Sequence, residues 1–364
     1  MKMIQYFVQE AQYSISQCTK NITIRILEEM NMLRMGFLGQ GGITSVHYAG
    51  YQNLKKEGFE VSIDAIADVR PEMLEKHDAP RKYADYNDLL EAEVGKLDFV
   101  DICLPTFLHA PAAIKAMELG YNVLVEKPMA LNYELCMQMC ETAKKTGKLL
   151  MVAQCCRFSN FADAVRDYMA SGELGAVRHA CFKRDDGTPR WAWENWFLKG
   201  ELSGGALLDL HVHDVDLLNS LFGVPKYVSS GGGIYIEGDG VDYVSSNYYY
   251  DNGLYNHSTG GWVTDNQSHY GRIYRVDFEK GHMIQTVIGG QQVFKLCKAD
   301  GEVIDLNEKY PAYCSYTAEI RYFTECLVKG LPVTRCLPDS TADSIRIART
   351  EEVSAKNMGE RIAL

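Results

Sequence analysis

An alternation of short apolar runs with helical patterns, between about residues 35 and 153, constrains the fold of this chain most. The apolar runs are continuous, as in strands buried on both faces of a sheet. The predicted strands are Met35–Leu38, Val61–Ala67, Phe99–Leu104, Asn122–Val125 and Leu149–Ala153. The predicted helices are Ser45–Lys56, Glu72–Lys76, Ala110–Leu119 and Tyr133–Lys145. This alternation predicts an α/β domain with a doubly wound parallel sheet and right-handed crossovers.

The character of the sequence changes after about Arg157. Helical patterns cover Phe161–Ser171, Ala206–Leu221 and Ser340–Asn357, and a strand is predicted at Val177–Lys183. Residues 226–304 are strand-like, with glycine-marked turns, which predicts antiparallel strands with one face on a helix layer. We therefore predict a nucleotide-binding domain at 35–155, a substrate-binding and oligomerisation α/β domain at 156–336, and a C-terminal helix at 337–364 that packs back on the body.

Composition narrows the class of protein. The chain has 364 residues, enough for two domains, and its net charge of −11 argues against nucleic acid as a partner. No apolar run approaches the roughly 20 residues of a membrane span, so no membrane partner is expected. The 11 cysteines include no C-x-x-C pair, and several lie in apolar runs. Free thiols in a reducing compartment are therefore expected, and with them a cytoplasmic location.

The first 34 residues do not fit the domain pattern. They contain basic residues but no continuous apolar core and no small-residue cleavage site, so a signal peptide is not expected. Ile22–Met35 has the pattern of an amphipathic helix. We interpret residues 1–34 as an N-terminal extension, either a peripheral helix or a product of an upstream start codon, that the chemistry does not need.

A glycine-rich turn joins the first predicted strand to the first predicted helix. Gly39-x-Gly41 matches the first two glycines of G-x-G-x-x-G, which let a pyrophosphate approach backbone N–H groups at a helix N-terminus. Thr44 occupies the third glycine position, which predicts looser packing of the helix on the strand. The candidate cofactor residues of this turn are Gly39, Gln40, Gly41, Gly42 and Ile43.

Asp68 ends the second predicted strand. A carboxylate there can accept hydrogen bonds from the adenosine ribose and repel a 2′-phosphate, which favours NAD over NADP. Arg70 instead favours NADP, because a nearby arginine can hold a 2′-phosphate. Both residues are candidate cofactor contacts.

The stretch Glu126-Lys127-Pro128 ends the fourth predicted strand. Proline keeps Lys127 out of the α region and stops the strand, so the lysine points to the carboxyl edge of the sheet, where ligands bind. We predict that the Lys127–Pro128 bond is cis. The alternative is a strand-end lysine in solvent with no role.

Four segments together resemble the glucose–fructose oxidoreductase / inositol dehydrogenase (Gfo/Idh/MocA) family. They are Pro105-Thr106-x-x-His109, Glu126-Lys127-Pro128, Gln154-x-x-Arg157-Phe158 and Gly204-Gly205-Ala206-Leu207-Leu208-Asp209-Leu210-His211-Val212-His213-Asp214-Val215-Asp216. The resemblance extends from about Met35 to the C-terminus. It implies a Rossmann domain, then an α/β domain with a large open, mostly antiparallel sheet, and an active site between them.

The resemblance also implies a reaction. The family mostly oxidises or reduces one secondary hydroxyl of a sugar, sugar derivative or cyclitol with NAD(P), and its catalytic residues match Lys127, Asp209 and His213. Its members commonly pair through the open sheet face, which predicts a homodimer or homotetramer. Further candidate cofactor residues are Leu104, Pro105, Thr106, His109, Glu126, Lys127 and Gln154.

The chemistry of the three residues fits these roles. Asp209 and His213 are spaced i, i+4, so an α-helix would present both on one face. His213 can take or return the hydroxyl proton, and Lys127 can stabilise the developing alkoxide. Asp209 can orient the imidazole or bind a neighbouring hydroxyl. Whether Lys127 or His213 is the base stays open. His211 would lie on another helix face, so no metal site is predicted.

The substrate contacts are predicted with alternatives. The candidates are Lys127, Arg157, Asp209, His213 and Trp193. The tryptophans at 191, 193 and 196 suit either a carbohydrate surface or an interface. Arg157 either reaches the substrate or braces the interdomain hinge, and His109 either approaches the nicotinamide or caps a helix.

These features predict an NAD-dependent oxidoreductase acting on a sugar, glycoside or cyclitol, possibly by oxidation of a glycoside at C3. Three alternatives stay open. They are an inositol 2-dehydrogenase, a redox-assisted glycoside cleavage with tightly bound and recycled NAD, and a nucleotide-sensing regulator without catalysis.

Overall fold

The computed structural model of the protein describes residues 32–236, 238–263, 271–288 and 291–364. The expectations for residues 1–31, including most of the amphipathic helix, lie outside the described residues. The first strand begins at Leu33, two residues earlier than expected.

The first sheet is parallel and doubly wound, as predicted. Its six strands follow the order β3-β2-β1-β4-β5-β6. They are β1 (Leu33–Leu38), β2 (Val61–Ala67), β3 (Arg81–Tyr83), β4 (Phe99–Ile102), β5 (Asn122–Glu126) and β6 (Leu150–Ala153). The connecting helices are α2 (Gly42–Lys56), α3 (Tyr86–Ala92), α4 (His109–Glu118) and α5 (Tyr133–Thr146).

The connection after β2 differs from the prediction. The expected helix at 72–76 is a short 3₁₀ turn, Pro71–Glu75, and it is followed by β3 and α3, which the sequence pattern did not predict. β3 consists of Arg81, Lys82 and Tyr83 at the sheet edge, and none of the three is buried. A short edge strand with charged residues has no apolar run, so the pattern of apolar residues does not reveal it.

The second sheet is large, open and mostly antiparallel, as the resemblance implies. Its nine strands follow the order β14-β13-β12-β11-β7-β10-β9-β8-β15, and β7 and β10 pair in parallel. They are β7 (Val177–Gly187), β8 (Tyr227–Gly233), β9 (Tyr243–Tyr249), β10 (Tyr255–Val263), β11 (Gly271–Phe278), β12 (Gly281–Ile288), β13 (Gln291–Lys298), β14 (Val303–Asp305) and β15 (Ile362–Ala363).

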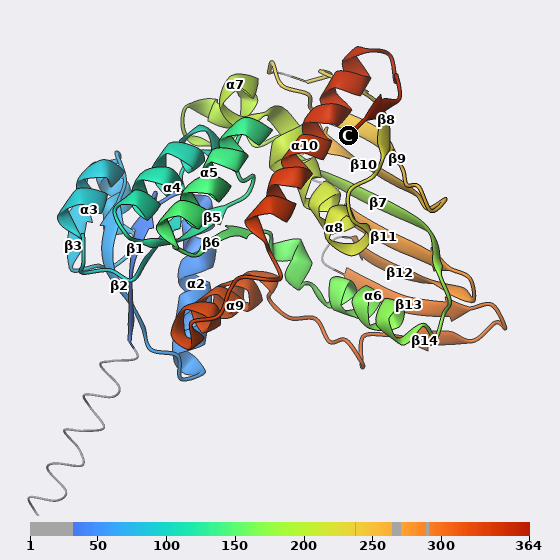
Figure 1. The fold of residues 1–364 in the computed structure, drawn as a ribbon, viewed down its shortest axis with the longest axis horizontal. Helices are drawn as coiled ribbons and strands as arrows, with labels where there is room; N and C mark the ends of the chain where they lie inside the picture. Colours follow the sequence, from blue (N-terminus) through green and yellow to red (C-terminus); the bar gives the residue numbers. More distant parts are fainter. Residues whose placement is uncertain (1–31, 237, 264–270, 289–290) are drawn as a thin grey trace, which may run out of the picture.

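One face of this sheet is covered by helices. Residues of α6 (Asn160–Ser171), α8 (Val212–Phe222) and α10 (Pro338–Lys356) share a hydrophobic core with the inward residues of the strands (Figure 1). Along β9, buried residues alternate with partly exposed ones, so the other face of the sheet carries the partly exposed set.

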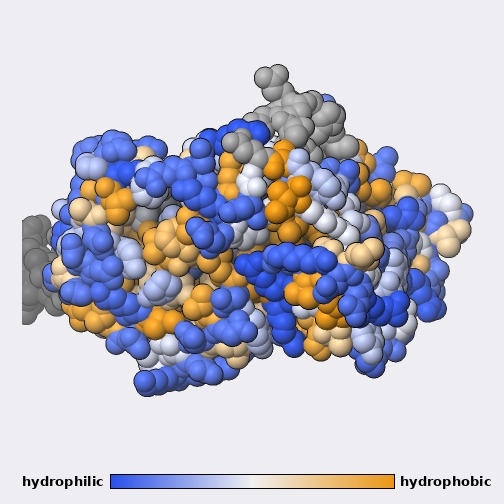
Figure 2. All heavy atoms as spheres, turned by 90° about the horizontal axis from the view of Figure 1, so that it is seen from above, coloured by the Kyte–Doolittle hydropathy of each residue, from blue (hydrophilic) through white to orange (hydrophobic). Residues whose placement is uncertain are grey.

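Two helices tie the domains together. The helix α9 (Ser315–Lys329), which we did not predict, packs against α2, where Ile320 and Phe323 join the same core as Tyr51 and Phe99. It lies in the range assigned to the second domain but covers the first. The last helix, α10, contacts α5 on one side and α8 and β8 on the other (Figure 1). Hydrophobic and hydrophilic side chains are interspersed over both domains on the face seen in Figure 2.

Candidate functional site

The phosphate turn has the geometry that the glycine pattern predicts. Gly39 has φ +91°, and a Cβ on it would lie 2.6 Å from the carbonyl oxygen of Cys103. A Cβ on Gly41 would meet nothing within 4 Å, so the space beside the start of α2 is open. The helix has no side-chain cap there, which leaves its N–H groups for an anion. The looser packing expected at Thr44 is wrong, because its side chain is buried and its hydroxyl donates to the carbonyl of Gly39 at 2.9 Å.

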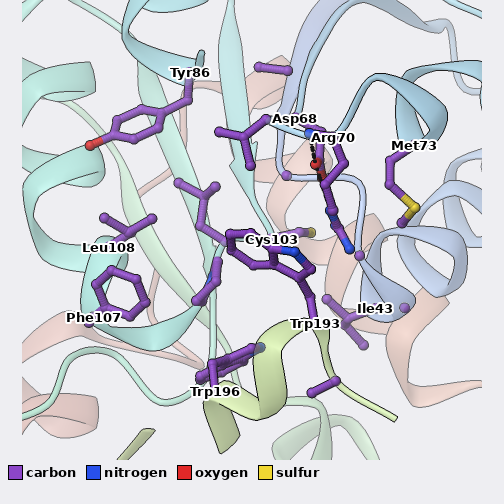
Figure 3. Close-up of a pocket in the computed structure, with 18 of the residues that line it drawn as sticks. Ile43, Asp68, Arg70, Met73, Tyr86, Cys103, Phe107, Leu108, Trp193 and Trp196 are labelled. Atoms are coloured by element: carbon purple, nitrogen blue, oxygen red, sulfur yellow. Dashed lines mark hydrogen bonds and ion pairs between the residues drawn. The ribbon is translucent and has the colours of Figure 1, made fainter. Parts of the chain in front are cut away.

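A cavity of about 640 Å³ extends from this turn. It is lined by Gly39, Gly41, Gly42, Ile43, Asp68, Arg70, Leu104 and Pro105, and by a loop of the second domain, Trp191–Phe197 (Figure 3). Asp68 accepts two hydrogen bonds from the Arg70 side chain, both at 2.9 Å, and one from the N–H of Gln40 at 2.8 Å. Burial raises the pKa of Asp68, but the hydrogen bonds from Arg70 and Gln40 lower it more, so the carboxylate stays ionised.

Trp193 lies at this cavity and not beside the three candidate catalytic residues. The guanidinium of Arg70 is 5.5 Å from the centre of a Trp193 ring, and Figure 3 shows the indole beside Arg70. Trp193 is 43% exposed and Trp191 is 74% exposed, so both indoles retain a large free surface. Trp193 therefore lines the cofactor cavity at the end that carries Asp68 and Arg70, and its contact with a substrate stays a prediction.

Lys127 and Asp209 meet, although they are far apart in the sequence. The Nζ of Lys127 donates to the backbone oxygen of Asp209 at 2.6 Å and to its Oδ1 at 3.1 Å. Burial lowers the pKa of Lys127, but Asp209 and Glu126 raise it more, so the ammonium is retained. The Lys127–Pro128 peptide bond is cis, as predicted. The strand-end lysine in free solvent is thus excluded.

Asp209 lies in a π-helical turn, Leu207–His211, that precedes α8. The spacing of Asp209 and His213 suggested a regular α-helix, but the structure has a π-turn at Asp209 instead. Single π-turns occur often at functional sites because they change the direction of one side chain. The indole Nε1 of Trp262 donates to Asp209 Oδ2 at 3.3 Å and so fixes the carboxylate. Trp262 was not predicted, because its place follows only from the pairing of β10 with β7.

His213 is buried near the first turn of α8, and its Nδ1 lies 3.9 Å from the Sγ of Cys156. Burial lowers the pKa of His213, and the positive charge of Lys127 lowers it further, which together outweigh the opposing effect of Cys156. The imidazole is therefore neutral near pH 7, and a neutral imidazole can accept a proton.

A buried network supports Glu126, and it was also not predicted. His47 lies between two carboxylates, with Nδ1 at 2.8 Å from Asp101 and Nε2 at 2.7 Å from Glu126. Burial lowers the pKa of His47, but Asp101 and Cys103 raise it more, so His47 carries a proton on each ring nitrogen. The other oxygen of Glu126 accepts the N–H of Lys127 at 3.0 Å. This network anchors the backbone from which Lys127 extends.

Arg157 and His109 are both held by contacts within the protein. Arg157 is 2% exposed and donates twice to Asp216 at 2.7 Å, which supports the bracing role, while its contact with a substrate stays a prediction. The ring of His109 lies between the carbonyl oxygens of Leu104 and Pro128, at 2.8 Å from each. It therefore connects the loops that follow β4 and β5. The helix-capping role is wrong, because Leu108 is the N-cap residue of α4 and the helix has no side-chain cap, whereas the approach of His109 to the nicotinamide stays a prediction.

Some buried polar atoms of the described residues, near the end of the first sheet, have no hydrogen-bond partner. Among the residues described, both amide atoms of Gln154 and the Oε1 of Gln40 are buried without a hydrogen-bond partner. The open side of Gly41 and the exposed indoles, which line the cavity, fit a bound NAD(P). No helix in the described part of the chain is long and apolar enough to span a membrane, and its ten described cysteines are free.

Two family models match the chain. Residues 33–154 match the model described as "Oxidoreductase family, NAD-binding Rossmann fold", and residues 162–284 match the "GFO/IDH/MocA C-terminal domain". Residues 33–154 therefore form an NAD-binding Rossmann domain.

Curated relatives and solved structures agree with the family models. The chain is 30% identical over 204 residues to D-glucoside 3-dehydrogenase of Escherichia coli (strain K12), covering 54% of this chain and 56% of that protein. It is 30% identical over 247 residues to scyllo-inositol 2-dehydrogenase (NAD(+)) of Bacillus subtilis (strain 168), covering 64% of this chain and 68% of that one.

A levoglucosan dehydrogenase in complex with NADH and levoglucosan has a similar fold, with a TM-score of 0.81 and 18% identity over 91% of this chain and 99% of that chain. The matched part spans little more than half the length of several of the curated relatives. The two family models and the relative from Bacillus subtilis, which the chain matches over most of its length, lead to one conclusion: the chain belongs to the Gfo/Idh/MocA family of oxidoreductases.

Proposed function

We propose that the protein is an NAD-dependent oxidoreductase that transfers a hydride between a secondary hydroxyl of a sugar, glycoside or cyclitol and the nicotinamide. One observation carries the proposal. A partly buried lysine at the carboxyl edge of the dinucleotide-binding sheet contacts an aspartate of the second domain, and a neutral histidine lies one helical turn beyond that aspartate.

The electrostatics favour distinct roles for the three side chains. His213 acts as the base, because its lowered pKa leaves it neutral, whereas the raised pKa of Lys127 keeps that residue cationic. The Lys127 ammonium stabilises the alkoxide that develops as the hydroxyl loses its proton. Asp209 aims the ammonium and, through its remaining acceptor capacity, binds a neighbouring hydroxyl of the ring.

The residues that would hold the cofactor are the phosphate turn Gly39–Ile43, the Asp68–Arg70 pair and the two exposed indoles of the second domain. When bound, NAD supplies the acceptor for the hydride. Asp68 favours a free ribose 2′-hydroxyl, and it engages the Arg70 fork through both carboxylate oxygens. This pairing supports the choice of NAD over NADP.

Glycoside C3 oxidation is the first substrate class to test, and inositol oxidation the second. Among the curated relatives are a D-glucoside 3-dehydrogenase and a scyllo-inositol 2-dehydrogenase, each 30% identical over its matched region. These matches support a polyhydroxylated ring as substrate. The family resemblance, rather than these matches, is the ground on which we propose a homo-oligomer formed through the open face of the second sheet.

The direct test is turnover by two variants. A panel of glycosides, free sugars and inositols is screened for NADH absorbance, with NADP in parallel. We expect Lys127→Ala and His213→Asn each to lower kcat about a hundredfold or more, because each removes a group that acts on the reacting hydroxyl. NAD affinity, measured by calorimetry, should change little.

Lys144→Ala is the matched control, because Lys144 also pairs with an aspartate, Asp339, but the pair is exposed and remote from the site. Full activity of either active-site variant would refute the roles, and turnover with NADP alone would refute the assignment to Asp68.

A second function is favoured by the loop that covers the cofactor cavity. The indoles of Trp191 and Trp193 line the cavity from the second domain, so a bound dinucleotide would be enclosed between domains. A retained NAD suits redox-assisted glycoside cleavage, in which the cofactor is not consumed. NAD released on denaturing the purified protein, together with turnover without added NAD, would favour this function over a dehydrogenase that exchanges its cofactor.

A further inference from the structure

Cys156 is a buried cysteine at the centre of the site that the roles above do not use. It lies in the short helical turn Cys155–Phe158 that follows β6, and it is 5% exposed. Its Sγ is 3.9 Å from Nδ1 of His213 and 3.2 Å from Nη2 of Arg184. A thiol enclosed by nitrogen donors is in an environment that stabilises the thiolate.

The groups around the sulfur of Cys156 stabilise a negative charge on it. A hydrogen bond from the neighbouring Cys155 lowers the pKa of Cys156 most. Burial opposes that effect, and Arg184 and His213 lower the pKa further, so it lies well below its usual value. The Arg184 guanidinium is itself fixed by Asp214 at 2.8 Å, so the donor cannot turn away from the sulfur.

The two nitrogens of His213 have different environments. Nδ1 faces the sulfur, whereas Nε2 has no hydrogen-bond partner among the described residues. In hydrolytic triads a carboxylate holds Nδ1–H and so leaves Nε2 free to take a proton. No carboxylate in the described ranges hydrogen-bonds this imidazole, and the sulfur occupies the equivalent place.

We propose that Cys156 is the positioning residue for His213: its thiolate accepts the Nδ1–H hydrogen bond and thereby leaves the Nε2 lone pair free for the substrate proton. The proposal rests on the role of His213 proposed above. When the substrate O–H bond breaks, the proton moves to Nε2 and the ring becomes an imidazolium beside the thiolate. In the reductive direction the same proton returns to the oxygen. The sulfur forms no bond to the substrate and is not oxidised.

Several charged and titratable groups face this pair and set its ionisation. They are Lys127 after β5, Cys155 in the same turn, Arg184 on β7, Asp214 on α8, Tyr274 on β11, and Tyr316 and Glu319 on α9. The ligand atoms of Cys155, Cys156 and His213 also lie within 4.8 Å of one another. Because a bound cation would itself fix the tautomer, the test below is performed in the presence of a chelator.

The proton on His213 can be located without any substrate. We would label the full-length protein with ¹⁵N-histidine, record long-range ¹H–¹⁵N correlation spectra over a pH series, and assign His213 by its loss in His213→Asn. In the wild type we expect a neutral ring protonated on Nδ1 near neutral pH. In Cys156→Ala we expect loss of that preference and a pKa of His213 lower by about one unit or more, because the adjacent anion is gone.

Cys156→Ser separates charge from hydrogen bonding. The hydroxyl can still accept from Nδ1–H but carries no charge, so we expect the tautomer to persist while the pKa of His213 falls. Cys140→Ala is the matched control, since Cys140 is equally buried but lies on α5, and its spectra should match the wild type. A wild-type ring protonated on Nε2, or an unchanged His213 in Cys156→Ala, would overturn the proposal.

Activity adds a second readout that a merely structural cysteine would not affect. In Cys156→Ala the acidic limb of the pH profile of kcat/KM for the oxidative direction should move to lower pH, and kcat should fall more than KM changes. A fall in activity without movement of that limb would also overturn the proposal. If no sugar or cyclitol is turned over by the wild type, the proposed function fails, while the spectra still decide the role of Cys156.

Discussion

At the scale of single residues, the ammonium of Lys127 is held by one residue in two ways. Asp209 accepts from it with both its backbone oxygen and its side chain, and the indole of Trp262 fixes the other carboxylate oxygen. The lysine therefore has little freedom to swing out of the site. In the proposed reaction, a charge held in advance where an oxyanion develops costs no reorganisation.

His47 is the second residue for which the structure makes a prediction. His47→Gln removes a buried cation between Asp101 and Glu126 and should lower the free energy of unfolding by about 3 kcal/mol near pH 6. The folded pKa of His47 is raised, so its stabilisation is complete below the unfolded pKa of about 6.5 and is lost as pH rises through the folded pKa. The difference between wild type and variant should therefore shrink at alkaline pH.

Urea unfolding across a pH series measures this difference. His179→Gln serves as the control, because His179 also faces a carboxylate, Asp277, but the pair is partly exposed and should contribute less than about 1 kcal/mol. A stability difference for His47→Gln that grows with pH would contradict a protonated His47.

At the scale of elements, the apolar runs predicted the buried strands, because strands covered on both faces carry a local pattern. The edge strand β3 and the helix α9 have no such pattern, since their places depend on β2 and α2, which are distant in the sequence. The π-turn at Asp209 could not be predicted for a different reason. The i, i+4 spacing of Asp209 and His213 is equally compatible with an α-helix and with a π-turn. Motif spacing thus predicts which residues form the candidate site but not the direction of their side chains.

The same limit applies to the supporting residues of the site. Lys127, Asp209 and His213 follow from the family resemblance, and the structure brings the first two into contact. His47 and Trp262 support them from α2 and β10, and no local pattern distinguishes a supporting histidine or tryptophan from an ordinary core residue.

The loop Trp191–Phe197 makes a prediction of its own. Trp193→Ala should weaken NADH binding about threefold to tenfold and speed its release, because the indole contributes a cation–π contact with Arg70 and one wall of the cavity. Energy transfer from tryptophan to NADH in stopped flow would measure both quantities. Trp196→Phe keeps an aromatic ring on the same loop and is the control. Unchanged NADH release in Trp193→Ala would remove the support for an enclosed cofactor.

At the scale of the whole molecule, the open face of the second sheet is the surface on which we expect subunits to pair. Ile273→Arg on β11 places a charge on that face, where Ile273 is 36% exposed, and should shift a dimer or tetramer towards the monomer. Light scattering coupled to size exclusion would report the mass. Val353→Arg, at an exposed position of α10, should leave the mass unchanged. A wild-type monomer at micromolar concentration would refute the expected pairing.

The packing of α9 on α2 has a consequence for the order in which the molecule forms. A ribosome releases the whole six-stranded domain long before it releases α9, so the side of α2 that Ile320 and Phe323 cover stays open while the second domain is made. During that interval a hydrophobic surface of the nascent chain is exposed to solvent and to other proteins. We expect this surface to attract a chaperone, and the first domain expressed alone to aggregate unless α9 is supplied with it.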